Sequence, residues 1–213
     1  MAIAILPAAG QSTRMGRPKL LLPFGTSTIV GSAVEALRAA GVGRIVLVRA
    51  PGASDLDAWA RTERLEVAIN PHPERGMLSS ILAGLDLLGG SEVIASGGEP
   101  IVISPADMPA IRPSSIRALV SAHLASDRPL AVGTFRGKRG HPLVIAPTLA
   151  SHLGDLDTNV GLKHLLASGH GLLELELDDP GVVRDVDTPA DYRALQAELE
   201  SDRIRAQKET RDP

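Results

Sequence analysis

A loop rich in small residues and cations follows the first apolar run of the chain, and it carries the clearest chemistry. Gly10 and Gly16 let the backbone turn tightly, and the amides between them can form a nest for phosphate oxygens. Arg14, Arg17 and Lys19 supply positive charge to neutralise such oxygens. The loop indicates a polyphosphate site, although a surface loop with solvated cations would have the same composition.

Two common nucleotide-binding motifs do not fit this loop. A dinucleotide fingerprint needs a glycine two residues after Gly10, where the chain has Ser12. A P-loop needs four residues between its glycines and ends in Gly-Lys-Ser/Thr, whereas here Gly16 comes after five residues and is followed by Arg17. The spacing favours neither hydride transfer nor a Walker-type NTPase.

Acidic residues near predicted strand ends are candidates for the Mg²⁺ ion that accompanies a triphosphate, because Mg²⁺ usually takes one or two protein carboxylates. Asp107 follows the apolar run Ile101–Ser104, and ligands collect at the carboxyl ends of strands in open α/β sheets. Asp185 and Asp187 precede the last predicted helix, and Asp191 lies in its first turn. A turn role for Asp107 and a helix-terminus role for Asp187 remain alternatives, and we expect structural roles for Asp185 and Asp191.

Two further segments could contact a base or an acceptor. Pro73–Gly84 reads as a glycine turn entering a helix, where Ser79 and Ser80 are either ordinary first-turn residues or readers of base-edge acceptors. Arg136–Val144 predicts a basic glycine hairpin between two strands. Its cations could hold an acceptor phosphate, and His141 is either a turn residue or an acceptor contact.

Alternating strands and helices must position these residues. Because such alternation implies a buried, mostly parallel sheet, we predict a Rossmann-like α/β fold of three layers, with helices on both faces. We expect one domain over 1–200 and a frayed, charged tail over 201–213. Strands are predicted at Ala2–Leu6, Arg44–Val48, Leu65–Ile69, Ile101–Ser104, Leu130–Thr134, Leu143–Ala146 and, at a half-solvated edge, Leu172–Leu177. Helices are predicted at Ser27–Ala40, Ser54–Arg64, Leu78–Leu88, Pro113–Ser126, Val160–Ala167 and Pro189–Gln207.

Composition narrows the class of protein. The 213 residues are 44% apolar and carry 22 Lys and Arg against 25 Asp and Glu, so the net charge is −3 and we expect no nucleic-acid partner. Cysteine is absent, which excludes disulfides and thiolate metal sites. The first apolar run is too short to span a membrane, so we expect a cytoplasmic protein without a membrane partner. Four aromatic residues make base stacking an improbable mode of recognition.

The segment from Ala8 to Lys19, Ala-Ala-Gly-x-Ser-x-Arg-Met-Gly-x-x-Lys, resembles the signature of MobA-like nucleotidyltransferases, and most closely their molybdenum cofactor cytidylyltransferase branch. The resemblance covers most of the chain, from Ile5 to Tyr192. It implies a sheet of the nucleotide-diphospho-sugar transferase type, an NTP and Mg²⁺. The pair Ala8 and Ala9 is similar to the cytidine-type signature rather than the guanosine-type Leu-Ala-Gly-Gly, which favours CTP.

The resemblance also implies roles for individual residues. Arg14, Lys19 and Asp107 would be catalytic. Asp107 in Asp-Met-Pro and Asp187 in Asp-x-Asp-Thr-Pro would hold the metal, and Ser80 in Ser-x-Leu-Ala-Gly-Leu would lie beside the cytosine. The expected nucleotide-binding residues are Ala8, Ala9, Gly10, Ser12, Arg14, Gly16, Lys19 and Ser80.

These implications predict transfer of CMP from CTP to molybdopterin-bound molybdenum with release of pyrophosphate, and a molybdenum hydroxylase or dehydrogenase that receives the product. His141, in a Gly-His-Pro motif similar to one of that branch, is expected to contact the acceptor. Two alternatives remain. One is cytidylyl or guanylyl transfer to another phosphorylated small molecule, such as a polyol or sugar phosphate. The other is a non-catalytic accessory protein that binds a nucleotide or cofactor.

Overall fold

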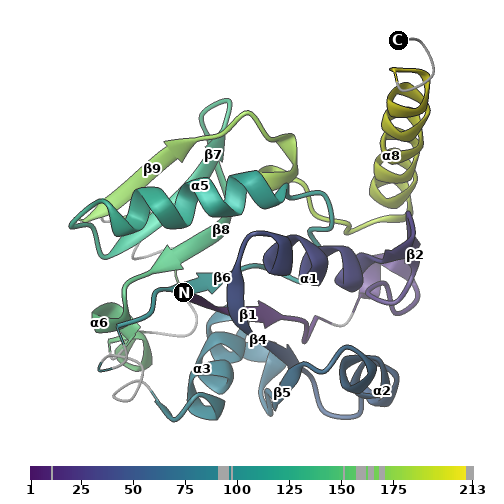
Figure 1. The fold of residues 1–213 in the computed structure, drawn as a ribbon. Coiled ribbons are helices and arrows are strands. Elements are labelled where there is room, and N and C mark those ends of the chain that lie inside the picture. Colours follow the sequence, from purple (N-terminus) through teal and green to yellow (C-terminus); the bar gives the residue numbers. More distant parts are fainter. Residues whose placement is uncertain are drawn as a thin grey trace.

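The computed structural model describes residues 1–10, 12–90, 96, 98–150, 152–156, 162, 166–167 and 171–209. Figure 1 shows the ribbon with the elements labelled. The strands are β1 (Ala2–Pro7), β2 (Pro23–Phe24), β3 (Ser27–Thr28), β4 (Val42–Arg49), β5 (Glu66–Ile69), β6 (Ile101–Ile103), β7 (Leu130–Phe135), β8 (Lys138–Ile145) and β9 (Leu172–Glu176). The α-helices are α1 (Ile29–Ala39), α2 (Ser54–Thr62), α3 (Met77–Leu87), α5 (Pro113–Leu124), α6 (Pro147–Ala150) and α8 (Pro189–Glu209). Four 3₁₀ helices join them: η1 (Thr13–Met15), η2 (Pro73–Arg75), η3 (Leu153–Asp155) and η4 (Pro180–Val183).

Seven strands form one sheet in the order β5-β4-β1-β6-β8-β7-β9, and β2 and β3 form a separate small hairpin. All pairings in the large sheet are parallel except the two that involve β8. The exception follows from the connection between β7 and β8. Arg136 and Gly137 make a two-residue turn with φ of 49° and 73°, a geometry that joins antiparallel strands. The predicted mostly parallel α/β sheet is confirmed.

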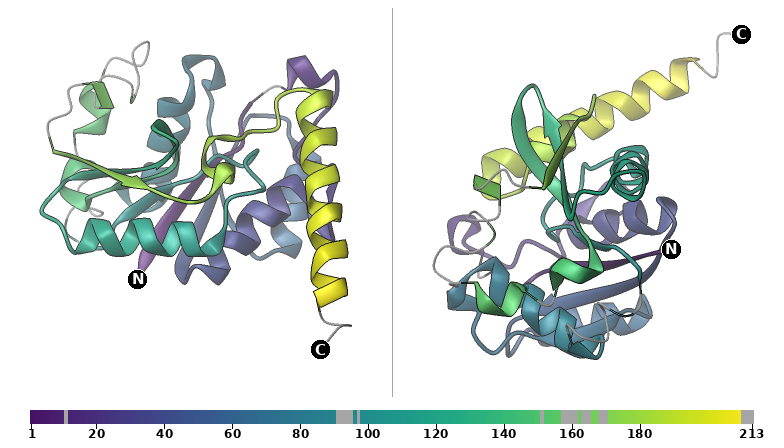
Figure 2. Two further views of the ribbon diagram at one scale, coloured as in Figure 1. Left: turned by 90° about the horizontal axis from the view of Figure 1, so that it is seen from above. Right: turned by 90° about the vertical axis from the view of Figure 1, so that its left-hand side faces the viewer.

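Side chains that alternate along the strands build two hydrophobic cores, one on each face of the sheet. On β1, Ala4 and Leu6 point to one face, and Ile3 and Ile5 to the other, because successive side chains of a strand project to opposite sides. The first face packs on α1, α2 and α5, and the second on α3 and the region of α6 and η3. The three layers are visible in the two views of Figure 2.

The predicted strands and helices that fall in the described part of the chain have observed counterparts, whereas β2, β3 and α6 were not predicted. β8 begins at Lys138 rather than Leu143, so His141 lies within a strand and not in a turn. The charged tail continues α8 as far as Glu209, so fraying of that end stays a prediction. The predicted helix over 160–167 falls largely outside the described residues. Within the part of the chain that the structure describes, no helix is long and apolar enough to cross a membrane.

Candidate functional site

The phosphate-binding candidate is a tightly turned loop after β1. Ser12 adopts φ of 52°, a left-handed conformation uncommon for a residue with a side chain, and Gly16 adopts φ of 66° at the end of η1. Ala8 N–H donates to Val48 O at 2.7 Å, which fixes the start of the loop on β4. Met15 is buried in a small cluster with Val186 and other apolar residues. The loop is therefore anchored at both ends, and one of its anchors belongs to the segment that enters α8.

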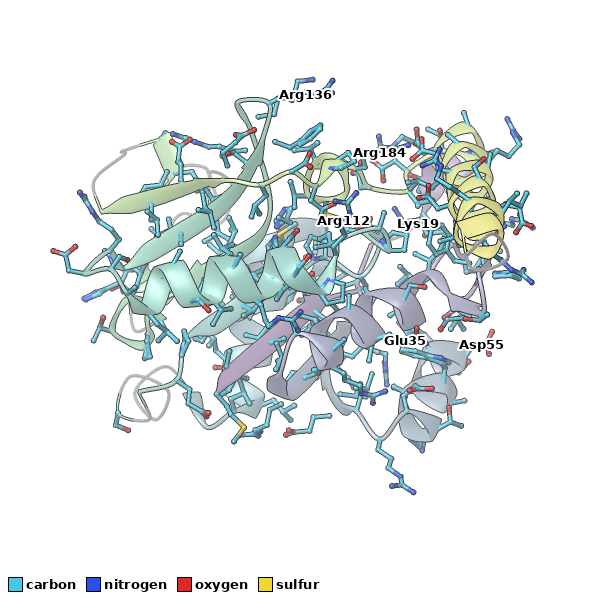
Figure 3. All side chains as sticks on the ribbon, turned by 45° about the horizontal axis from the view of Figure 1, so that its top comes forward. Lys19, Glu35, Asp55, Arg112, Arg136 and Arg184 are labelled. Atoms are coloured by element: carbon cyan, nitrogen blue, oxygen red, sulfur yellow. The ribbon has the colours of Figure 1, made fainter. Side chains whose placement is uncertain are left out.

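The two carboxylates predicted to hold a metal do converge, and Lys19 joins them. Its ammonium donates to Asp107 Oδ2 at 2.7 Å and to Asp187 Oδ1 at 2.9 Å. Arg14 Nη2 lies 2.5 Å from the other oxygen of Asp187. The backbones are linked as well, since Val186 N–H donates to Asp107 O at 2.9 Å. Figure 3 shows Lys19 close to the segment that leads into α8.

The ion-pair cluster is buried at Lys19 and partly open to solvent at its two carboxylates. The side chain of Lys19 is 8% exposed, whereas those of Asp107 and Asp187 keep 25% and 23% of their surface accessible. Burial alone would lower the pKa of Lys19, but the two carboxylates outweigh it and raise that pKa. Burial also opposes ionisation of Asp187, yet Lys19 and Arg14 lower the pKa of Asp187. Lys19 and Asp187 therefore both carry their charge at neutral pH.

Asp185 is a third carboxylate that the sequence analysis treated as structural. It is exposed, and partial desolvation together with the negative charges of Asp187 and Asp107 raises its pKa. Asp185 therefore shares the negative field of Asp187 and Asp107. Asp191, in contrast, belongs to the helix: its Oδ2 accepts from Thr188 N–H at 2.7 Å, and Thr188 Oγ1 accepts from Asp191 N–H at 3.2 Å. This reciprocal pair caps the first turn of α8.

The donor set fits a magnesium ion that is shared with a substrate. Asp107 and Asp187 offer hard carboxylate oxygens on one side of a pocket, and Mg²⁺ bound with a nucleotide usually takes one or two carboxylates and completes its octahedron with phosphate oxygens and water. Within the described ranges no cluster of three His, Cys, Asp or Glu residues could hold a metal by itself. Most of the ligands of such an ion would therefore come from the nucleotide.

Two adjoining pockets lie at the carboxyl ends of β1 and β6, each of about 200 Å³. Pro7, Gly10 and Asp107 line both of them, so they form one continuous depression. The first is also lined by Ala8, Ser12, Thr13, Arg14, Lys19, Leu20 and Asp187. The second is also lined by Ala9, Pro73, Gly76, Met77, Ser80 and Pro105. The charged pocket suits phosphates, and the less charged one suits a base.

The predicted site residues fall into two groups. Ala8, Ala9, Gly10, Ser12, Arg14, Lys19, Ser80, Asp107 and Asp187 all line the two pockets. Gly16 instead closes η1, and Arg17 is exposed outside the lining. The sequence analysis missed Thr13, which lines the first pocket, Met15, which anchors the loop, and Asn70, which contacts Ser80. The apolar type of Met15 within a polar loop was the available signal.

His141 lies near the site without lining either pocket. The pairing of Ile103 with Leu143 places it beyond the end of β6, on the side of Asp107. Its Nδ1 is buried and has no hydrogen-bond partner among the residues that the structure describes, and desolvation lowers its pKa to about 4, partly opposed by Asp107 and by the backbone of Ile103. His141 is therefore neutral at physiological pH. Arg136 lies at the exposed hairpin tip, away from Lys19 (Figure 3).

The chain is similar to several named proteins and solved structures. Nicotine blue oxidoreductase of Paenarthrobacter nicotinovorans is 30% identical over 208 residues, covering 90% of this chain and 95% of that protein. Molybdenum cofactor cytidylyltransferase of Escherichia coli is 27% identical, covering 88% and 92%. The structure of Rv0371c from Mycobacterium tuberculosis in complex with manganese superimposes with a TM-score of 0.70 at 26% identity, covering 92% and 98%.

The profile of the MobA-like NTP transferase domain matches residues 4–174. These residues include the loop after β1, every residue that lines the second pocket, and Asp107. The match extends over most of the sheet, so it is not confined to the short signature after β1. The chain therefore belongs to the MobA-like NTP transferase family, a family of nucleotidyltransferases.

Proposed function

We propose that this protein transfers CMP from CTP to the phosphate group of molybdopterin that carries bound molybdenum, and releases pyrophosphate. The observation that carries the proposal is the ammonium of Lys19 held between Asp107 and Asp187 on the wall of a glycine-lined pocket. This arrangement places cationic side chains that could bind phosphates beside carboxylates that could bind a metal ion. The Escherichia coli relative, whose name states this reaction, supports the choice of CTP and of acceptor.

The chemistry is an in-line substitution at phosphorus. An oxygen of the acceptor phosphate attacks the α-phosphorus of CTP and forms a new P–O bond. The bond from the α-phosphorus to the oxygen shared with the β-phosphate breaks, and its electron pair leaves with pyrophosphate. A phosphate monoester is already anionic at neutral pH, so no general base and no covalent enzyme intermediate are needed. Positioning and charge stabilisation supply the rate enhancement.

Within this reaction the chain binds and neutralises charge. Arg14 and Lys19 would leave the carboxylates and contact phosphate oxygens, and the amides of the loop after β1 would cradle the same group. Asp107 and Asp187 would hold Mg²⁺, which supplies neutralisation of the charge that builds up on the phosphates. Ser80 would contact the cytosine from the second pocket. His141 would contact the acceptor as a neutral imidazole. The partner that receives the product would be a molybdenum hydroxylase or dehydrogenase, in the cytoplasm.

The test follows label from CTP carrying ³²P at the α-phosphate. With Mg²⁺ and the molybdenum-loaded pterin, label should move into a dinucleotide and equimolar pyrophosphate should appear. Without the acceptor, neither product should form. Asp107→Asn should slow transfer by about 10²–10³-fold, the loss typical of removing one preorganised stabilising group. Asp86→Asn, on the exposed side of α3, is the matched control and should transfer at the wild-type rate.

Three results would redirect the assignment. Transfer from GTP in place of CTP would overturn the assignment of CTP as the nucleotide donor. Transfer to a sugar or polyol phosphate would overturn the assignment of molybdopterin as the acceptor. Nucleotide binding without turnover would indicate an accessory protein. Because one relative is named as an oxidoreductase, oxidation of NADH and NADPH is measured in parallel, and turnover there without label transfer would contradict the proposal.

A further inference from the structure

A buried asparagine stands behind the second pocket. Asn70 follows β5 and is 1% exposed, and its N–H donates to the backbone of Arg49 at 2.8 Å. Its side-chain amide nitrogen donates to Ser79 Oγ at 2.8 Å and to Ser80 Oγ at 2.9 Å. Its side-chain oxygen accepts from His72 N–H at 2.9 Å. A single side chain therefore joins β5, the turn before η2 and the first turns of α3.

These partners fix which way the amide points. A backbone N–H can only donate, so the atom of Asn70 that faces His72 must be the oxygen. The nitrogen then faces both serines and contributes one hydrogen to each. Because both amide hydrogens are used, Ser79 Oγ and Ser80 Oγ each accept a hydrogen bond from inside the protein.

The two serines differ in where their own hydroxyl hydrogens go. Ser79 Oγ donates to backbone carbonyls, with His72 O at 2.9 Å and Gly76 O at 2.7 Å. Gly76 O, four residues before Ser80, is the kind of carbonyl that a helical serine often engages, but the hydroxyl that donates to it is that of Ser79. Among the described residues Ser80 Oγ has no acceptor for its hydrogen, and Ser80 lines the second pocket.

We propose that Asn70 is a positioning residue for base selection: by donating to Ser80 Oγ it keeps that hydroxyl a hydrogen-bond donor toward the pocket. The pocket then selects a base with an acceptor at that position. Cytosine carries a lone pair at N3 where uracil carries N–H, so the arrangement favours CTP over UTP. This inference rests on the proposed function and adds the group that sets its nucleotide preference.

The test measures dissociation constants of CTP and UTP in the presence of Mg²⁺ and takes their ratio. Wild-type protein should prefer CTP by at least about tenfold, since a mismatched partner leaves a buried polar group unpaired. In Asn70→Asp the ionised carboxylate can only accept, so Ser80 must donate to it and presents lone pairs to the pocket. The ratio should fall toward one at pH 8.

A double-mutant cycle shows whether Asn70 acts through Ser80. Ser80→Ala should lower the ratio by itself, and adding Asn70→Asp to Ser80→Ala should change it no further. Ser79→Ala is the matched control, because Ser79 contacts Asn70 but lies outside the pocket lining, and it should keep the wild-type ratio. If Asn70→Asp does not fold, Asn70→Ala carries the test, and its ratio should also fall because Ser80 loses its fixed orientation.

The outcomes separate this inference from the proposed function. If Asn70→Asp weakens CTP and UTP equally and only lowers the melting temperature, Asn70 is merely structural and the inference is wrong. If the two changes in the cycle are additive, Asn70 does not act through Ser80. Neither result changes the outcome expected in the label-transfer assay, so the proposed function would stand. A wild-type protein that binds CTP and UTP equally overturns the inference together with the base assignment.

Discussion

Lys19 neutralises two neighbouring carboxylates in the ligand-free protein. Two carboxylates near each other at a pocket wall would repel, and each would lose solvation through partial burial. The ammonium of Lys19 offsets both effects, with Asp107 at 2.7 Å and Asp187 at 2.9 Å. A buried lysine without partners would instead tend to lose its proton. The ammonium thereby holds two carboxylates side by side at the pocket wall.

His123 on α5 provides a test of burial at the scale of one residue. Its side chain is 5% exposed, its Nδ1 has no hydrogen-bond partner, and desolvation lowers its pKa from 6.5. As pH falls below 6.5, His123 binds a proton in the unfolded chain more readily than in the folded protein. Protonation therefore favours the unfolded chain, and the free energy of unfolding falls on acidification. His123→Gln should therefore lose less melting temperature than wild type between pH 7.5 and pH 5.5.

The measurement is a pair of thermal melts at the two pH values for each protein. His152→Gln, at an exposed position, is the control and should follow the wild-type pH dependence. A His123→Gln protein that loses as much melting temperature as wild type would show that the imidazole protonates in the folded state without cost.

Some of the site could be predicted from single residues and some could not. The types and spacing of Gly10, Arg14 and Lys19 predict that they share one pocket, and all three line it. The contact of Lys19 with two aspartates could not be predicted, because it joins residues 88 and 168 positions apart in the sequence. Asn70 is polar and isolated after a strand, and only its three partners reveal what it does.

At the scale of elements, β8 and η4 pack so closely that only glycine fits between them. A Cβ on Gly140 would lie 1.8 Å from Val182 O and 2.6 Å from its carbonyl carbon, and backbone atoms cannot move aside alone. η4 leads directly into the segment that carries Asp187. Gly140→Ala should therefore displace that segment, lower stability by about 1–3 kcal/mol or more, and weaken CTP binding with Mg²⁺.

Chemical denaturation and CTP titration check this expectation. Gly154→Ala on η3 is the control, because a Cβ there meets no atom within 4 Å, and it should leave both quantities near wild type. Equal stability in the two variants would mean that η4 yields without cost and does not position Asp187.

The elements that sequence reasoning placed best are those with continuous apolar runs. β1 and β6 are buried on both faces and stand out as such runs. β8 was placed five residues too late, since its first half is charged and its polar face is turned away from the core. Arg136 also occupies a turn position with positive φ, where Asn or Gly would have been the recognisable signal.

At the scale of the whole molecule, three chain segments meet at one edge of the sheet. The loop after β1 supplies cations, the loop after β6 supplies Asp107, and the segment after η4 supplies Asp187. Ligands collect at this edge in open α/β sheets because loops from neighbouring parallel strands converge there. α8 holds the third segment in place, since Tyr192 Oη donates to Pro23 O at 2.5 Å, and Figure 1 shows β2 beside the start of α8.

The charge balance of this assembly predicts that metal and nucleotide bind cooperatively. Without ligands, Asp107 and Asp187 are neutralised by Lys19 and Arg14, so Mg²⁺ alone must displace both cations. CTP alone brings a triphosphate toward two carboxylates. When both are present, phosphates attract the cations and the carboxylates are free to bind the metal. We expect each ligand to tighten the other by about 10–100-fold, equal in both directions as linkage requires.

Calorimetric titration of Mg²⁺ with and without CTP, and of CTP with and without a chelator, measures this coupling. Lys19→Met is the decisive variant. With one cation removed, Mg²⁺ alone should bind more tightly than it does to wild type, while the gain from CTP should shrink because a phosphate contact is lost. Removal of the metal by chelation should return wild-type CTP affinity to its weak value. Mg²⁺ that binds the ligand-free wild type as tightly as its CTP complex would show that Lys19 does not compete for the carboxylates.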